Sequence, residues 1–162
     1  MARTSFVALG LCLWLPFAAG CATEASGPHK GGFQYNATGA TPGKDDSLYR
    51  DLGGQENISA FTVEFVGLVS KDDRIGHFFA NVNLDHLGQE LTEQFIDLSG
   101  GPVKYTGREM AEVHGSLGIT NADFNRLAED LQVAMNHHNV PFATQNRLVA
   151  LLASMQRVVV TK

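Results

Sequence analysis

The sequence Gly-Gly-Pro-Val-Lys-Tyr-Thr-Gly-Arg-Glu-Met-Ala-Glu-Val-His occupies residues 100–114 and ends on a histidine, His114. His114 lies in a short segment bounded by Gly107 and Gly118. Its neighbours at helical spacing are apolar: Met110, Val113 and Leu117. A helix over this segment would therefore turn the imidazole towards apolar surroundings. An isolated helical histidine is more often a hydrogen-bonded or exposed residue than a ligand, so this pattern alone leaves both interpretations open.

On both sides of this stretch, apolar residues recur at spacings of three and four, which is typical of helices packed on a core. The pattern predicts helices over residues 57–70 and 84–98, a third that begins at Thr120, and a last one that runs from Pro141 to about Val159. Thr120 is a predicted N-cap with Asp123 three residues later. No strand-like alternation bounded by hairpin turns occurs. The predicted fold class is all-α, with the glycine pairs at 53–54 and 100–101 as hinges.

Composition limits the classes of function. The chain has 162 residues, of which 44% are hydrophobic and 18% charged, enough for one domain with a sizeable core. Its net charge is -5, and no run of Lys and Arg exceeds two residues. Binding to phosphate backbones needs a concentrated basic surface, so nucleic acid is not an expected partner.

The first residues have the features of an export signal. Arg3 precedes an apolar stretch over residues 6–17, and small residues then lead to Cys21. Small residues before a cysteine are similar to a bacterial lipobox, although Ala18 stands where Leu is usual. We therefore expect an exported lipoprotein at the cell envelope, associated with a membrane through lipidated Cys21. Ordinary signal cleavage nearby and an uncleaved anchor are the alternatives.

The domain boundaries follow from this. Residues 1–21 are the predicted signal, residues 22–46 a flexible linker rich in small residues, and residues 47–162 the globular domain. The two cysteines, Cys12 and Cys21, both fall in the signal. The domain therefore has no cysteine for a disulfide, a zinc site or a thiol nucleophile.

The six histidines form neither a His-Glu-x-x-His motif nor a Cys/His cluster, so a zinc hydrolase is not supported. No Gly-x-Ser-x-Gly motif, P-loop or dinucleotide fingerprint occurs. A haem is a flat, apolar macrocycle whose iron needs one imidazole, and it fits the surroundings of His114. Phenylalanines at helical spacing are usually core residues, so composition and spacing alone do not select haem over a packed helical bundle.

Five motifs in order carry a family resemblance. They are residues 47–54 (Ser-Leu-Tyr-Arg-Asp-Leu-Gly-Gly), residues 72–79 (Asp-Asp-Arg-Ile-Gly-His-Phe-Phe), residues 100–114, residues 118–124 (Gly-Ile-Thr-Asn-Ala-Asp-Phe) and Val140-Pro141. Together they resemble group I truncated haemoglobins, small globins of bacteria, protozoa and cyanobacteria that fold as two helices over two. The resemblance covers residues 47 to about 159, nearly the whole domain.

The resemblance implies a haem b whose iron is held by His114, with Phe79 wedged against the haem. It places Phe65, Leu87 and Phe95 on the distal side and along an apolar gas tunnel, and it implies an extended loop over residues 100–106. The full predicted set of cofactor-binding residues is Phe65, Val66, Phe78, Phe79, Leu87, Leu91, Phe95, Tyr105, Met110, His114, Ile119 and Phe124.

Three positions depart from the family's pattern. Val66 stands where the family usually has a distal tyrosine, Leu91 where it has a glutamine, and Glu90 where some members have a histidine that serves as sixth ligand. A hydrogen bond to a partly charged oxygen ligand contributes roughly 1.5–3 kcal/mol. An apolar distal side should therefore speed oxygen release by about 10- to 100-fold. Gln94 and His86 are the two candidates for a substitute polar group.

The resemblance implies reversible binding of diatomic gases: oxygen, nitric oxide or carbon monoxide. One alternative is enzymatic, the conversion of nitric oxide to nitrate, for which an external electron donor would be required because the chain carries no reductase domain. A second alternative is an interaction module that binds no haem. The presence of His114 argues against that second alternative.

Overall fold

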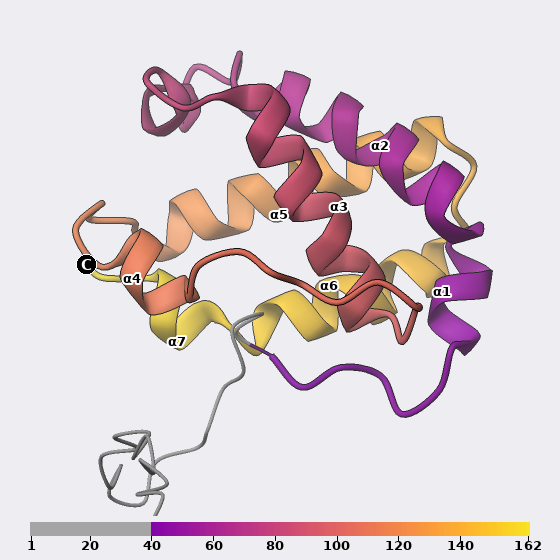
Figure 1. The fold of residues 1–162 in the computed structure, drawn as a ribbon. Helices are drawn as coiled ribbons and strands as arrows, with labels where there is room; N and C mark the ends of the chain where they lie inside the picture. Colours follow the sequence, from indigo (N-terminus) through magenta and orange to yellow (C-terminus); the bar gives the residue numbers. More distant parts are fainter. Residues whose placement is uncertain (1–39) are drawn as a thin grey trace, which may run out of the picture. The chain divides into compact units, whose positions relative to one another are not determined.

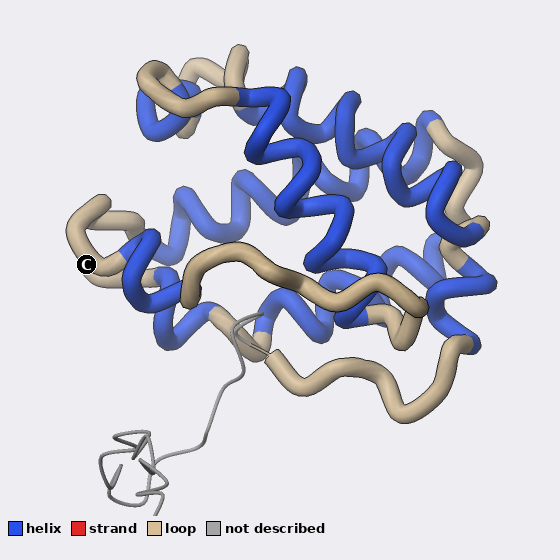
Figure 2. Tube along the Cα trace, viewed as in Figure 1, coloured by secondary structure: helices blue, strands red, loops and turns tan. Residues whose placement is uncertain are grey.

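The computed structural model describes residues 40–162 (Figure 1). The predicted signal, including Cys21, and residues 22–39 of the predicted linker lie outside them. The described chain forms α1 (Ser47–Asp51), α2 (Gly54–Val69), the 3-10 helix η1 (Gly76–Phe79), α3 (Leu84–Leu98), α4 (Met110–His114), α5 (Asn121–His137), α6 (Phe142–Ala153) and α7 (Gln156–Val159). Within residues 40–162 there is no strand, as Figure 2 shows. None of the helices described there is long and apolar enough to cross a membrane.

Four helices form the body of the domain. α2 packs against α3 and α5, and α6 packs against α1, α3 and α5. An aromatic cluster joins α2 to α3, because the ring of Phe95 lies 6.1 Å from that of Phe61 and 6.3 Å from that of Phe65. All three rings are almost fully buried, and each such pair contributes about 0.5–1.5 kcal/mol beyond the burial of its area.

Two glycines fix the turns at which the predicted hinges lie. Gly53, with a φ of 89°, precedes α2, and Gly100, with a φ of 84°, follows α3. A Cβ atom on Gly100 would collide with the carbonyl oxygen of Asp45. Only glycine fits there, both for its positive φ and for this close approach.

The last residues of the predicted linker contact the domain. Ala40 is 1% exposed, and the amide of Gly43 donates a hydrogen bond to the carbonyl of Leu98 over 2.9 Å. The Asp45 carbonyl packs on Gly100. These contacts tie residues 40–46 to the end of α3.

The segment predicted as one last helix is divided in two. The Ser154 hydroxyl donates to the carbonyl of Leu151 over 2.6 Å, and the amide of Met155 donates to Leu152, three residues back. This tight turn ends α6 and redirects α7 against α4 and α5. Beyond α7, the amides of Thr161 and Lys162 donate to the carbonyl of Ile119.

The start of α5 confirms the predicted cap. The Thr120 hydroxyl accepts a hydrogen bond from the amide of Asp123 over 3.3 Å, and the Asp123 carboxylate accepts one from the amide of Thr120 over 2.9 Å. This reciprocal pair satisfies two amides that the first turn of a helix would otherwise leave without partners.

Thr120→Ala should lower the free energy of unfolding by about 1 kcal/mol, because it removes the acceptor for the Asp123 amide. Urea unfolding followed by circular dichroism measures the change. Thr120→Ser keeps the hydroxyl and is the control. Equal midpoints for the alanine variant and the wild type would show that the cap contributes nothing.

Candidate functional site

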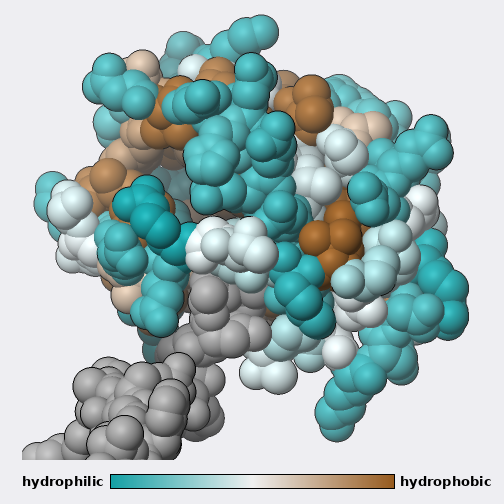
Figure 3. Space-filling model, in the orientation of Figure 1, coloured by the Kyte–Doolittle hydropathy of each residue, from teal (hydrophilic) through white to brown (hydrophobic). Residues whose placement is uncertain are grey.

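A cavity of about 480 Å³ lies among the helices, and most of its lining is apolar. Its walls come from the end of α2, from η1 and the loop after it, from α3, from α4 and from α5 to α7. Figure 3 shows apolar side chains around a hollow on the left of the domain, between η1 and α3 above and α4 below. A cavity of this size and polarity is typical of a small-molecule or cofactor site.

Eleven of the twelve residues predicted to bind a cofactor line this cavity. They are Phe65, Phe78, Phe79, Leu87, Leu91, Phe95, Tyr105, Met110, His114, Ile119 and Phe124. Val66 is buried in α2 but does not line the cavity. Successive residues of an α-helix point about 100° apart, and in α2 it is Phe65 whose side chain reaches the cavity.

His114 is the last residue of α4, and its ring lies in the cavity wall. Its Nδ1 lies 2.8 Å from the carbonyl oxygen of Met110, one turn earlier. Burial lowers the pKa of His114, and the bond to the Met110 carbonyl offsets part of that effect. The ring is therefore neutral, with its proton on Nδ1 donated to Met110, and Nε2 keeps a free lone pair. A histidine that ligates a metal has this arrangement.

The chain itself offers few other metal ligands. Among the described residues, no group of three or more His, Cys, Asp or Glu side chains could hold a metal ion. A metal bound to Nε2 of His114 would need its other ligands from a macrocycle or from small molecules. The apolar lining fits a macrocycle, because a flat apolar ring is stabilised by burial there.

The wall formed by α3 is apolar at Leu87 and Leu91. The two polar candidates on this helix, His86 and Gln94, also line the cavity, and both lie close to other side chains. The His86 side chain is 66% exposed, and its Nε2 lies 3.4 Å from Oε1 of Glu90. The Gln94 amide is 3% exposed, and its Nε2 lies 3.5 Å from Sδ of Met110 and 3.8 Å from Sδ of Met155.

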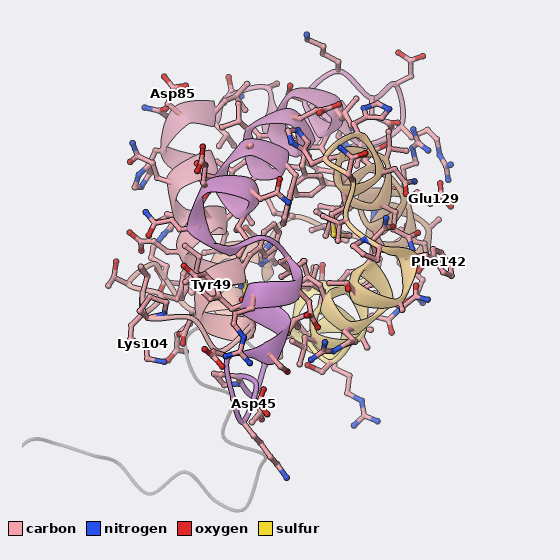
Figure 4. All side chains as sticks on the ribbon, turned by 90° about the vertical axis from the view of Figure 1, so that its right-hand side faces the viewer. Asp45, Tyr49, Asp85, Lys104, Glu129 and Phe142 are labelled. Carbon is pink, nitrogen blue, oxygen red and sulfur yellow. The ribbon has the colours of Figure 1, made fainter. Side chains whose placement is uncertain are left out.

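The loop between α3 and α4 is extended, as expected, and a buried carboxylate holds it. Asp97 accepts a hydrogen bond from Nζ of Lys104 over 2.8 Å and another from the amide of Tyr105 over 3.2 Å. In Figure 4, Lys104 and Asp85 lie on the same side of the domain. Asp85 is in the first turn of α3, and Lys104 belongs to the loop that follows this helix. These two hydrogen bonds to Asp97 hold the loop in a position where the Tyr105 ring lies in the cavity wall.

The phenol of Tyr105 is a hydrogen-bond donor at neutral pH. Its Oη donates to the carbonyl of Arg108 over 2.9 Å. Burial raises the pKa of Tyr105 to about 12, and the negative charges of Glu90 and Glu93 add to the effect. The group therefore positions the loop before α4 rather than exchanging protons.

Sequence reasoning missed the part of the lining that comes from the C-terminal helices. These residues are Val149, Leu152, Met155 and Val159. They have the same apolar spacing as core residues, so nothing in the sequence distinguishes a cavity wall from a packed helix. The turn after Ser154 decides which of them reach the cavity.

Comparison with known proteins identifies relatives. A family model for bacterial-like globins matches residues 47–161. A group 1 truncated haemoglobin of Tetrahymena pyriformis is 30% identical over 109 residues, which are 67% of this chain and 90% of that protein. A second, from Synechocystis, is 37% identical over 103 residues, 59% of this chain and 80% of that protein.

Solved structures of truncated haemoglobins have a similar fold. The Fe(III) form of the truncated haemoglobin from Tetrahymena pyriformis superposes with a TM-score of 0.68 at 29% identity, over 71% of this chain and 98% of that one. A 2/2 haemoglobin from Synechococcus, in the cyanomet state with covalently attached haem, gives a TM-score of 0.64 at 26% identity, over 70% and 98%.

Asp97→Ala should loosen the loop over residues 100–108, because Lys104 and the Tyr105 amide lose their shared acceptor. We expect a loss of about 1.5–3 kcal/mol in the free energy of unfolding and faster hydrogen exchange in this loop. Exchange measured by mass spectrometry tests it. Asp97→Asn keeps an acceptor for the Tyr105 amide, so its loop should exchange at a rate between those of the wild type and the alanine variant. Unchanged exchange in the alanine variant would show that Asp97 does not hold this loop.

Proposed function

The chain belongs to the bacterial-like globin family and has the two-over-two fold of truncated haemoglobins, and from this premise we propose that its cavity binds haem b through His114 and reversibly takes up diatomic gases. The main support for the proposal is the environment of the His114 ring. Its Nδ1 is occupied by the Met110 carbonyl, which leaves Nε2 for iron in the wall of an apolar cavity.

The residues that line the cavity would have different roles in holding haem. When bound, the haem supplies an iron with one coordination position for a gas. His114 holds and orients the iron from α4, and the backbone bond to Met110 fixes its tautomer. Phe78 and Phe79 of η1 and Phe124 of α5 give aromatic surface for the macrocycle. Leu87 and Leu91 exclude water from the side formed by α3.

The proposed gas side lacks a strong donor. Leu91 cannot donate a hydrogen bond, and the amide of Gln94, which also lines the cavity, contacts the thioethers of Met110 and Met155. Oxygen, which draws electron density from iron, depends on such a donor more than carbon monoxide does. We therefore propose weak oxygen retention and less affected binding of carbon monoxide and nitric oxide.

The proposed location is the cell envelope, with the domain tethered through lipidated Cys21. The support for it is the Arg3 leader, its apolar stretch and the small residues before the cysteine. The proposal for haem binding stands independently of this location.

His114→Ala should abolish stable haem binding, because the iron loses its protein ligand. Titration of the haem-free domain with haemin, followed by absorbance in the Soret region, measures the loss. His86→Ala is the matched control, since His86 also lines the cavity but pairs with Glu90, and its titration should equal the wild type. Wild-type binding by the His114 variant would refute the ligand assignment.

Leu91→Gln should slow oxygen dissociation by about 10- to 100-fold, because it places an amide donor in the apolar wall of α3. Stopped-flow displacement of oxygen by carbon monoxide measures the rate. Val63→Gln changes an exposed residue of α2 outside the cavity and should leave the rate unchanged. A wild-type protein that already releases oxygen as slowly as Leu91→Gln would contradict the apolar gas side.

A further inference from the structure

We propose that the thioethers of Met110 and Met155 form an oxidation site, at which hydrogen peroxide converts them to sulfoxides and Gln94 binds the added oxygen. The site lies in the cavity wall, where α4 and α7 pack against each other (Figure 1). It concerns the chain's own sulfur atoms. It therefore goes beyond gas binding and does not depend on the proposed haem.

One side-chain amide joins the two methionines. Nε2 of Gln94, in α3, lies 3.5 Å from Sδ of Met110 and 3.8 Å from Sδ of Met155. Met110 is the first residue of α4, and Met155 directly precedes α7. The two methionines are 16 and 61 positions away from Gln94 in the sequence, so the fold itself brings both sulfur atoms to one N–H donor group.

Both methionines border a space that a small oxidant can enter. Met110 and Met155 line the cavity, and they are 8% and 5% exposed. The cavity of about 480 Å³ is many times larger than a peroxide molecule, which has two heavy atoms, and Figure 3 shows the hollow at the surface. Peroxide can therefore reach this wall while the helices stay folded.

The third methionine of the described chain lies in a different environment. Met135, in α5, is 0% exposed, belongs to the hydrophobic core and does not line the cavity. A sulfoxide is polar and needs room for one more oxygen atom, and a close-packed core has no such room. Oxidation of Met135 therefore requires the fold to open, whereas oxidation of the cavity pair does not.

The chemical step needs only peroxide. A lone pair of the thioether sulfur attacks one oxygen of hydrogen peroxide, and the O–O bond breaks as the S–O bond forms. The departing hydroxide takes the proton from the transferred oxygen and becomes water. Sulfur is oxidised by two electrons, and peroxide is reduced by two. Within residues 40–162 no cysteine competes for the oxidant.

Gln94 binds the product better than the starting thioether. A thioether sulfur is a weak hydrogen-bond acceptor, whereas a sulfoxide oxygen carries partial negative charge and accepts strongly. Since Nε2 of Gln94 already lies beside both sulfur atoms, an oxygen added to either comes within reach of an N–H donor. The remaining wall is mostly apolar, and an oxygen without a donor would be costly there. Gln94 is therefore a positioning residue for the sulfoxide.

Treatment of the haem-free full chain with dilute hydrogen peroxide tests the site. Peptide mapping by mass spectrometry measures the gain of one oxygen at each methionine with time, and circular dichroism shows that the helices persist. We expect Met110 and Met155 to be oxidised about tenfold faster than Met135, or more. Equal rates at the three methionines, or no oxidation of the cavity pair, would overturn the proposal.

Gln94→Leu tests the donor. Leucine fills a similar space but removes the amide, so the sulfoxides lose their hydrogen bonds. After peroxide is removed with catalase, each protein is compared with its own reduced form by thermal unfolding. Oxidation should lower the Tm of Gln94→Leu by about 3–6 °C more than it lowers the Tm of the wild type. Equal shifts would contradict the role of Gln94.

Leucine in place of both Met110 and Met155 removes the two sulfur atoms with little change in volume, and peroxide should then leave the Tm unchanged. Met135→Leu is the matched control. It also replaces a buried methionine but keeps the cavity pair, so its Tm should shift as in the wild type. A wild-type shift in the double variant would place the oxidation elsewhere and overturn the proposal. None of these readouts uses haem, so they are separate from the haemin titration of His114→Ala.

Discussion

The hydrogen bond between the His114 ring and the Met110 carbonyl is the interaction on which the site depends. It is made within a helix of five residues, which is too short to be stable alone. α4 is therefore held by its neighbours: by α7, by the chain end that bonds to Ile119, and by the loop that Asp97 latches to α3. The orientation of one imidazole is thus set by the C-terminal segment and by the loop that leads into α4.

The helices around the cavity contact one another less closely than in a continuous core, so the packing beside the cavity matters for stability. The Phe61, Phe65 and Phe95 cluster lies directly beside the cavity and is nearly inaccessible to water, so it stiffens the α2–α3 wall. A bound macrocycle would fill the space and add its own buried area, which links stability to occupancy.

The sequence predicted the elements whose signals are local. The periodic helices and the Thr120 cap follow from neighbouring residues, and the structure confirms them. The extended loop over residues 100–106 followed from the family resemblance, and it too is present. The family resemblance placed eleven residues that line the cavity. The break after Ser154 could not be predicted. A serine within an apolar helical pattern is compatible with a continuous helix, and the sequence does not show that its hydroxyl bonds the carbonyl three residues earlier. The direction of Val66 and the thioether contacts of Gln94 depend on how helices far apart in the sequence rotate against each other.

The most direct test of the account is the visible spectrum of the purified domain after incubation with haemin: ferric, dithionite-reduced, and reduced under carbon monoxide. If His114 holds haem in this cavity, the Soret band should move sharply when carbon monoxide is added, because neither Leu87 nor Leu91 in the cavity wall could ligate iron. A protein that shows no Soret band after haemin addition, or whose reduced band does not respond to carbon monoxide, would contradict it.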